Sequence, residues 1–353
     1  MRIALTSDWH IHNYPQFASP WREGLNTRAR DIFEVVGALL PDILRQNNVD
    51  FLIHGGDWNW NASNDYRLVN LTRDAINNCR RVLPDRNNVL GVEGNHDSVV
   101  SRPGIHNARP YLEEDRWHPR IVDRVLLYPI GYNDTSLAIK SNGRYDRVLI
   151  FMHKDIQGGH AANGFIYKTE NEITLKNLLR LKRHHDARIF AGHYHDYQLI
   201  SNVVRVVGAP VQHNRGDADL DRGFCIYDTV DDSYRFIGLE GPKFLKLTVQ
   251  EAKARKFEAM TYVTLIADTE QDSREGQALI SDLGLMGVVV GNDQDRELVL
   301  EFDTDYRNMS DEELLKRWLE RNYSDLSSKE VDQLLKLSRS FDDGLREEVA
   351  GGL

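Results

Sequence analysis

Residues 1–10 of the chain read MRIALTSDWH, and this opening stretch decides the fold. Residues 3–6 form a short apolar run that predicts a buried strand, and Asp8 and His10 follow directly where the strand ends. Similar runs recur along the chain, separated by longer patterns with helical spacing. The runs cover residues 51–54, 89–92, 148–152 and 189–191, and the helical patterns cover residues 27–47, 66–83 and 174–184. This alternation predicts an α/β domain.

Side chains of the types that commonly bind metal ions follow each of the five predicted strands. They are Asp8, His10, Asp57, Asn95, His153, His193 and His195. The carboxyl ends of the strands in an α/β sheet lie along one edge, so we expect these side chains to converge on one site. Two carboxylates, an amide oxygen and four imidazoles suit manganese, iron or zinc better than calcium or magnesium. So many donors suit two ions about 3.5 to 4 Å apart, the arrangement that displaces an ester oxygen at phosphorus.

Each of these motifs has an ordinary interpretation when it stands alone. Residues 56–57 and 94–95 are also common turn pairs, and His193 and His195 are two histidines on one side of an extended segment, as a surface pair would be. The joint pattern argues against these interpretations, because every element ends in a ligand type, in order, after a predicted strand.

The composition indicates a globular protein with one large and one smaller domain. The chain has 353 residues, of which 41% are hydrophobic and 28% charged. No apolar stretch approaches the roughly 18 residues of a membrane span, so we expect a cytoplasmic protein with no membrane partner. Cys79 and Cys225 have no metal-type spacing and are expected to be buried thiols. The net charge of -10 argues weakly against a protein that coats nucleic acid.

The second half of the chain predicts further sheets and a helical end. Three strand-like runs without an intervening helix are expected to form a second, antiparallel-leaning sheet, at residues 203–207, 224–227 and 234–237. A boundary at residues 241–242 precedes a small α+β domain, residues 242–306, with strands at 244–249, 262–266, 288–290 and 298–302 and a helix at 277–283. Two capping boxes predict a helical hairpin over residues 307–353.

The ordered motifs resemble those of the calcineurin-like metallophosphoesterase superfamily. Its pattern is D-x-H, G-D, G-N-H-[DE], a lone H and G-H-x-H, which this chain matches at residues 8–10, 56–57, 94–97, 153 and 192–195. Within the superfamily, residues 1–10, 208–210 and 222–224 resemble SbcD-type nuclease subunits of bacteria and phages. The specific resemblance covers about residues 1–240. It implies two packed β-sheets flanked by helices, over a domain of residues 1–241.

The resemblance also implies a role for each motif residue. One ion is held by Asp8, His10 and His195, the other by Asn95, His153 and His193, and Asp57 bridges them. By family habit the ions are manganese. His96 stabilises or protonates the leaving group, and Asp97 is expected to hydrogen-bond its imidazole, with a turn cap as the alternative. Trp58 and Trp60 depart from the family pattern and either stack on unpaired bases or pack in the interior.

The activity that this resemblance implies is DNA end processing for repair or recombination. We expect a manganese-dependent DNA exonuclease and endonuclease subunit with a two-metal mechanism. The small domain would orient DNA, the helical hairpin would bind an SMC-like ATPase of the SbcC type, and the subunit would be a homodimer. The alternative for the apolar surface of the hairpin is docking on its own domain. The alternatives are a small-molecule phosphodiesterase or phosphatase of the same superfamily, and a DNA-end scaffold without catalysis.

Overall fold

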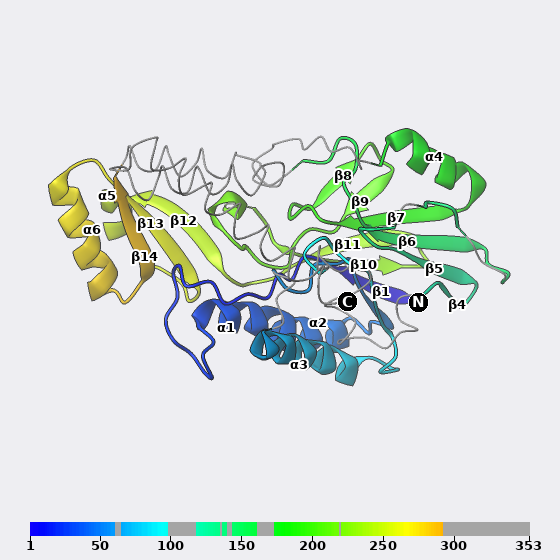
Figure 1. The fold of residues 1–353 in the computed structure, drawn as a ribbon, viewed down its shortest axis with the longest axis horizontal. Coiled ribbons are helices and arrows are strands. Elements are labelled where there is room, and N and C mark those ends of the chain that lie inside the picture. Colours follow the sequence, from blue (N-terminus) through cyan, green and yellow to red (C-terminus); the bar gives the residue numbers. More distant parts are fainter. Residues whose placement is uncertain are drawn as a thin grey trace, which may run out of the picture. The chain divides into compact units, whose positions relative to one another are not determined.

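The first strand lies at the centre of a five-stranded sheet. The computed structural model describes residues 1–60, 65–97, 118–134, 136–139, 143–160, 173–218 and 220–291. In it β1 (Arg2–Thr6) pairs in parallel with β2 (Phe51–His54), and β2 with β3 (Val89–Gly91). On its other side β1 pairs antiparallel with β10 (Gly223–Asp228), which pairs with β11 (Ser233–Gly238). The order of the sheet is β11-β10-β1-β2-β3 (Figure 1).

A second sheet of six strands has the order β4-β5-β6-β7-β9-β8. Its centre is a parallel set, β5 (Val125–Ile130), β6 (Arg147–His153), β7 (Ala187–Gly192) and β9 (Val204–Val206). The edges are β4 (Arg120–Val122) and β8 (Gln198–Ile200), each antiparallel to its neighbour. The strands that end at His153 and at Gly192 therefore run side by side, with their carboxyl ends at one edge.

Alternate residues of the strands separate the core into layers. Ile3 and Leu5 of β1 face a core that they share with Leu149 and Phe151 of β6, so the two sheets pack against each other. Ala4, between them, faces the helices on the outer side of the first sheet. Leu178 of α4 (Leu175–His184) packs with the outer side of the second sheet. The predicted sandwich of two sheets flanked by helices is confirmed.

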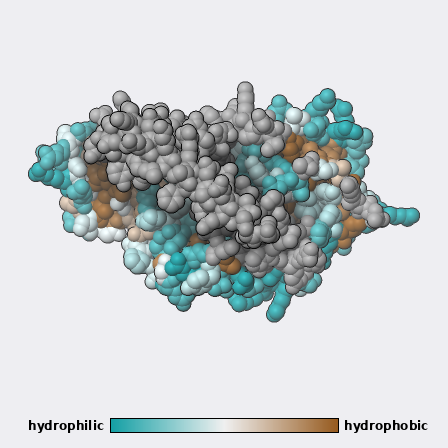
Figure 2. All heavy atoms as spheres, in the orientation of Figure 1, coloured by the Kyte–Doolittle hydropathy of each residue, from teal (hydrophilic) through white to brown (hydrophobic). Residues whose placement is uncertain are grey.

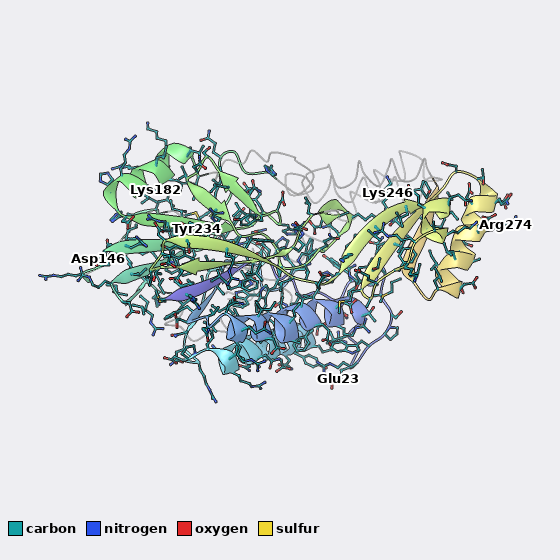
Figure 3. All side chains as sticks on the ribbon, turned by 180° about the vertical axis from the view of Figure 1, so that it is seen from behind. Glu23, Asp146, Lys182, Tyr234, Lys246 and Arg274 are labelled. Carbon is teal, nitrogen blue, oxygen red and sulfur yellow. The ribbon has the colours of Figure 1, made fainter. Side chains whose placement is uncertain are left out.

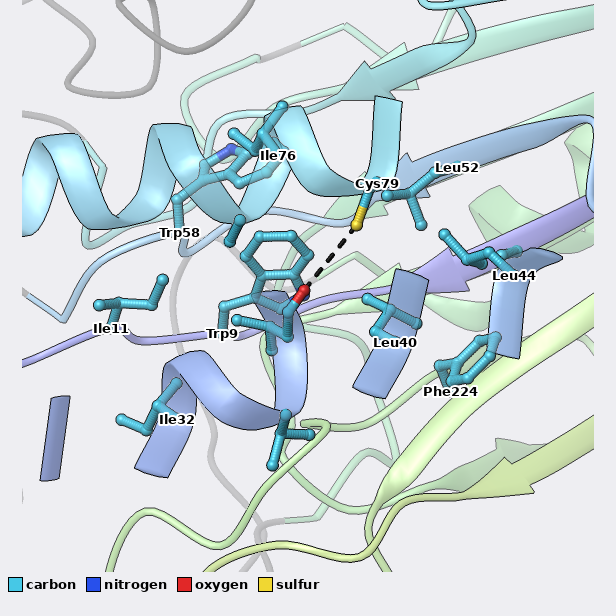
Figure 4. Close-up of a cluster of buried hydrophobic side chains, with 14 of the residues drawn as sticks. Trp9, Ile11, Ile32, Leu40, Leu44, Leu52, Trp58, Ile76, Cys79 and Phe224 are labelled. Atoms are coloured by element: carbon cyan, nitrogen blue, oxygen red, sulfur yellow. Dashed lines mark hydrogen bonds between the residues drawn. The ribbon is translucent and has the colours of Figure 1, made fainter. Parts of the chain in front are cut away.

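The helical layer of the first sheet contains the largest buried side chains. Trp9 and Trp58 pack edge to face with ring centroids 5.3 Å apart, beside Ile76 and the buried, free Cys79 (Figure 4). The surrounding helices are α1 (Thr27–Phe33), α2 (Leu40–Gln46) and α3 (Tyr66–Val82). Their outward surface is largely hydrophilic in the space-filling view (Figure 2). The predicted helix over residues 27–47 is continuous, with a π-helical segment at Glu34–Leu39.

Pro41 explains why the helix contains a π-helical segment. Its ring would clash with the carbonyl group four residues earlier in a regular α-helix, and it has no N–H group to donate. The amide of Leu40 donates instead to Val35 O, five residues earlier, which widens the turn just before the proline. The helix therefore continues through the proline without ending.

The structure corrects the predicted distribution of strands. The five strands that end in candidate ligands do not form one sheet, because β1 to β3 belong to the first sheet and β6 and β7 to the second. The runs at residues 203–207, 224–227 and 234–237 do not form a sheet of their own. The first joins β7, and the other two extend the first sheet from β1. The hairpin β4-β5 was not predicted, because its turn residues Asp123 and Arg124 adopt positive φ without a glycine.

A third, smaller sheet follows directly after residue 242. It has three parallel strands, β12 (Lys243–Thr248), β13 (Thr261–Ala267) and β14 (Met286–Gly291). The helices α5 (Val249–Lys253) and α6 (Glu270–Asp282) connect them, and each begins with a capping box. The predicted strand at 298–302 and hairpin at 307–353 lie outside the described residues. The division of the chain into domains at 241 and 306 stays a prediction.

The small sheet is tied to the first helix through a buried arginine. The Arg28 guanidinium lies over the rings of Phe244 and Tyr262, at 5.0 and 4.8 Å from their centroids. The Tyr262 hydroxyl donates to Asp31 Oδ2 at 2.5 Å, and Arg28 Nη2 donates to the backbone oxygen of His213 at 2.6 Å. These contacts connect the small sheet to the loop that contains His213.

None of the described helices is long and apolar enough to cross a membrane.

Candidate metal centre

The first group of candidate ligands comes from both sheets. Asp8 and His10 follow β1 of the first sheet, and His195 follows β7 of the second. The Nε2 atoms of His10 and His195 are 3.1 Å apart, and Asp8 Oδ1 lies 3.7 Å from His10 Nε2. One ligand atom from each of the three residues lies within 4.8 Å of the others. This spacing suits a single ion held by all three.

The second group meets around an amide oxygen. Asn95 Oδ1 lies 3.0 Å from His153 Nε2 and 3.1 Å from His193 Nδ1. Asn95 follows β3 of the first sheet, whereas the two histidines end β6 and follow β7 of the second. Two ring nitrogens and a carbonyl oxygen at these distances offer a second ion three ligands.

The Asp57 carboxylate lies between the two groups. Its Oδ2 atom is 3.6 Å from His10 Nε2, in the first group, and 3.2 Å from His153 Nε2, in the second. Asp57 is 1% exposed, and a buried carboxylate requires compensating positive charge. The position fits a carboxylate that bridges two cations.

Four of the candidate ligands have a strained backbone. Asp8, His10, Asp57 and His193 all have positive φ, between 43° and 86°. This left-handed conformation costs a residue other than glycine about 1 kcal/mol or more. Strain at four candidate ligands in one site indicates that the backbone is held there for their geometry and not for stability.

Glycines in the same loops leave room that a side chain would occupy. A Cβ atom at Gly94 would lie 2.0 Å from Asp57 Oδ1, and one at Gly56 would lie 2.4 Å from His153 Nδ1. A Cβ atom at Gly192 would lie 1.9 Å from Ser7 Oγ. Gly56 and Gly192 therefore allow the two sheets to approach each other at the ligands, and Gly94 leaves space for Asp57 within the loops of the first sheet.

The charges of the site fit divalent cations. Asp8 is fully buried, and none of the described residues hydrogen-bonds its Oδ1 atom. Burial raises the pKa of Asp8 and lowers that of His10 well below its ordinary value, so the His10 ring is neutral with a lone pair for an ion. Burial opposes the charged form of His153, yet the Asp57 carboxylate raises the pKa of His153 to about 9. Buried carboxylates thus attract positive charge to this position.

His96 is held by the loop that follows β2. Its backbone N–H donates to Asp57 Oδ1 at 2.9 Å, and its ring Nδ1 lies 2.5 Å from the backbone oxygen of Trp60. Because a carbonyl oxygen only accepts, Nδ1 carries the hydrogen and donates it. The other ring nitrogen is then available to a substrate at the site. To donate a proton from that nitrogen the ring must be doubly protonated, a form that burial disfavours by lowering the pKa of His96.

The structure corrects the predicted contact between Asp97 and the His96 ring. Asp97 is fully buried, and its carboxylate accepts three backbone N–H groups, from Asp57, Trp58 and Gly94, at 2.8 to 3.0 Å. The imidazole of His96 is oriented instead by Trp60 O. Asp97 thus acts as an anchor for two ligand loops, close to the turn cap that was the alternative.

The two tryptophans after Asp57 have different environments. Trp58 is fully buried and its ring stacks on His54 at 3.6 Å, so it cannot contact a base. Trp60 is half-buried, with its ring 5.2 Å from that of His96 and 5.5 Å from that of Tyr14. Only Trp60 keeps the predicted possibility of stacking on a substrate.

Two buried carboxylates at the site were missed by the sequence reasoning. Asp155 lies 2.8 Å from His193 Nε2, and Asp217 lies 3.5 Å from His195 Nδ1. Asp155 is only two residues after His153, and this spacing was a signal that could have been used. Asp217 lies in a short 3₁₀-helix, Arg215–Asp217, with no motif spacing to mark it.

Comparisons with known proteins identify the family of the chain. A family model described as calcineurin-like phosphoesterase matches residues 1–214. A search of curated proteins finds no match. Among solved structures, the chain is similar to a dimetal phosphatase from Danio rerio, with 14% sequence identity and a TM-score of 0.42, over 67% of this chain and 95% of that one.

We predict that Gly94→Ala weakens metal binding by at least about tenfold, because the added methyl group displaces the Asp57 carboxylate from between the two ligand groups. Isothermal titration of the purified chain with manganese measures the effect. The matched control is Gly238→Ala, whose Cβ atom meets no described atom within 4 Å. Unchanged manganese affinity in Gly94→Ala would show that Asp57 does not bind the ions.

Proposed function

Because the chain belongs to the calcineurin-like phosphoesterases, a family of metal-dependent phosphoesterases, we propose that it is a DNA-processing nuclease that hydrolyses phosphodiester bonds with two divalent ions. The observation that supports the chemistry best is the position of Asp57 between His10 and His153. We propose manganese as the ion because the donors mix oxygen with several imidazole nitrogens.

The chain itself supplies positioning and a proton. When bound, two ions supply charge that stabilises a phosphoryl group and activate water as the nucleophile. The residues that would hold them are Asp8, His10 and His195 for one and Asn95, His153 and His193 for the other, with Asp57 shared. His96 would donate a proton to the leaving oxygen from Nε2 when its ring is doubly protonated, while the Nδ1–H group stays hydrogen-bonded to Trp60 O.

DNA as the substrate is supported by the sequence and by one surface feature. Residues 1–10, 208–210 and 222–224 resemble SbcD-type nuclease subunits. The ring of the half-buried Trp60, beside those of Tyr14 and His96, offers an aromatic surface next to the proposed proton donor. Stacking on such a surface contributes about 1 to 3 kcal/mol per base in single-stranded nucleic acid complexes.

We predict that the purified chain digests linear duplex DNA or single-stranded circular DNA when manganese is present and neither without it. Gel electrophoresis of both substrates, with a small chromogenic phosphodiester in parallel, measures the activity. Rapid hydrolysis of the small ester with no digestion of DNA would favour a small-molecule phosphodiesterase. Binding of DNA ends without any hydrolysis would favour a scaffold.

We predict that His96→Ala lowers the rate of phosphodiester hydrolysis about 100-fold while two manganese ions remain bound, because the ring would donate a proton and belongs to neither of the two proposed ligand sets. Turnover and manganese content are measured on the same preparation. A suitable control is His118→Ala, in a solvent-exposed position outside the described site. Full activity of His96→Ala with intact metal content would exclude the role.

The proposed partner is an SMC-like ATPase, with the nuclease subunit as a homodimer. The support is the sequence of residues 307–353, whose apolar pattern contains more hydrophobic side chains than the two predicted short helices would hide against each other. We predict that deleting residues 308–353 abolishes co-purification with the SMC-like ATPase encoded in the same genome, while hydrolysis of a small phosphodiester is retained. A truncated chain that still forms the complex would refute this assignment of the hairpin.

A further inference from the structure

His193 and His195 present opposite ring nitrogens to the site. His195 directs Nε2 toward His10, whereas His193 directs Nδ1 toward Asn95 Oδ1. The segment between them is not extended, because φ of His193 is 86°. The sequence predicted two rings on one side of an extended segment, and this prediction is wrong. Each ring leaves its other nitrogen pointing away from the candidate ions.

A buried carboxylate faces each of these outward nitrogens. Asp217 Oδ1 lies 3.5 Å from His195 Nδ1, and Asp155 Oδ1 lies 2.8 Å from His193 Nε2. Asp217 is 2% exposed and Asp155 is 5% exposed. Neither belongs to the motifs that mark the site in the sequence. The pairing is one carboxylate to one histidine, and the two histidines belong to different ligand groups.

The Asp217 carboxylate is itself held in place. Arg222 Nη2 donates to its Oδ1 atom at 2.9 Å, and the backbone N–H of His213 donates to Oδ2 at 2.8 Å. Arg222 also donates from Nη1 to the backbone oxygen of His195. The arginine thus connects the carboxylate to the chain segment that carries the histidine, so the position of Asp217 relative to His195 is fixed from two sides.

His153, the third candidate ligand from the second sheet, faces a backbone carbonyl group instead of a carboxylate. His153 Nδ1 lies 2.6 Å from the backbone oxygen of Gly55, and no charged group is involved in that contact. A backbone carbonyl fixes the tautomer of a ring as a carboxylate does, but it adds less negative charge. A carboxylate therefore adds more negative charge next to His193 and His195 than the carbonyl adds next to His153, although Arg222 offsets part of the charge of Asp217.

We propose that Asp217 and Asp155 are positioning residues for separate ions, Asp217 through His195 and Asp155 through His193. A carboxylate accepts the hydrogen of the outward nitrogen, so the inward nitrogen keeps its lone pair for the metal. This inference rests on the two-ion site of the proposed function. It adds that each ion depends on its own positioning residue, so that the affinities for the two ions can be changed independently.

The test is a manganese titration of the full chain without DNA. Calorimetry and electron paramagnetic resonance monitor the binding. We expect Asp217→Asn and Asp155→Asn each to weaken one of the two binding events by about 10- to 100-fold and to leave the other unchanged. An isolated-ion resonance signal should replace that of the coupled pair at intermediate manganese. The matched control is Asp146→Asn, since this exposed residue precedes the opposite end of β6 (Figure 3).

Combination with the histidine variants separates positioning from a general effect on the fold. In a His195→Ala background, Asp217→Asn should have no further effect on the remaining ion, whereas Asp155→Asn should weaken it. The reverse should hold in a His193→Ala background. Thermal unfolding of every variant in the absence of metal controls for stability.

Two results would overturn the inference. One is manganese affinities of both Asn variants equal to those of the parent chain. The other is an effect of either Asn variant that persists in the background lacking its own histidine. The outcome is independent of the substrate proposal: a chain that binds two manganese ions but digests no DNA refutes the nuclease, and a nuclease whose Asn variants bind manganese normally refutes the positioning role.

Discussion

The Asp57 carboxylate, buried between histidines from two different sheets, is the constraint on which the rest of the structure depends. A negative charge without water around it is stable only with positive charge nearby. His153, whose pKa this carboxylate raises, and the neutral ring of His10 both lie near it. Asp97 fixes its loop by accepting the backbone N–H groups of Asp57 and Trp58. The glycine at 94 gives the carboxylate space. Strained backbone, glycine positions and the packing of the sheets all meet at this group.

Much of the site could be predicted from sequence because its signal is local. Each ligand motif follows an apolar run, and the residue types alone indicated a pair of ions. The helices were also predictable, since α3 and α4 have clear periodicity and capping residues at their start. What periodicity cannot show is which strand pairs with which. The five strands that end in ligands were therefore expected in one sheet, whereas β1 to β3 lie in one sheet and β6 and β7 in another. The ligands converge on one site because the two sheets pack against each other.

The remaining differences have equally specific causes. The proposed roles of Asp155 and Asp217 depend on which ring nitrogen of each histidine points outward. For His193 this depends on its positive φ, and Asp217 contacts His195 although 22 residues separate them in the chain. Asp97 looked like a partner of the adjacent ring because the two are neighbours in sequence, yet its side chain turns to backbone N–H groups of another loop. Contacts between loops are set by tertiary packing, which carries no short-range pattern.

The contacts of Arg28 connect the small sheet to the loop beside the candidate metal site. Its guanidinium lies over the aromatic rings of Phe244 and Tyr262 and also donates to the backbone oxygen of His213, whose own N–H group donates to Asp217. A molecule that shifts this guanidinium while binding the small sheet would change the free energy of ion binding, and ion binding would change the affinity for that molecule by the same factor. Occupancy of the small sheet and occupancy of the ion site would then be reciprocal quantities of a single equilibrium.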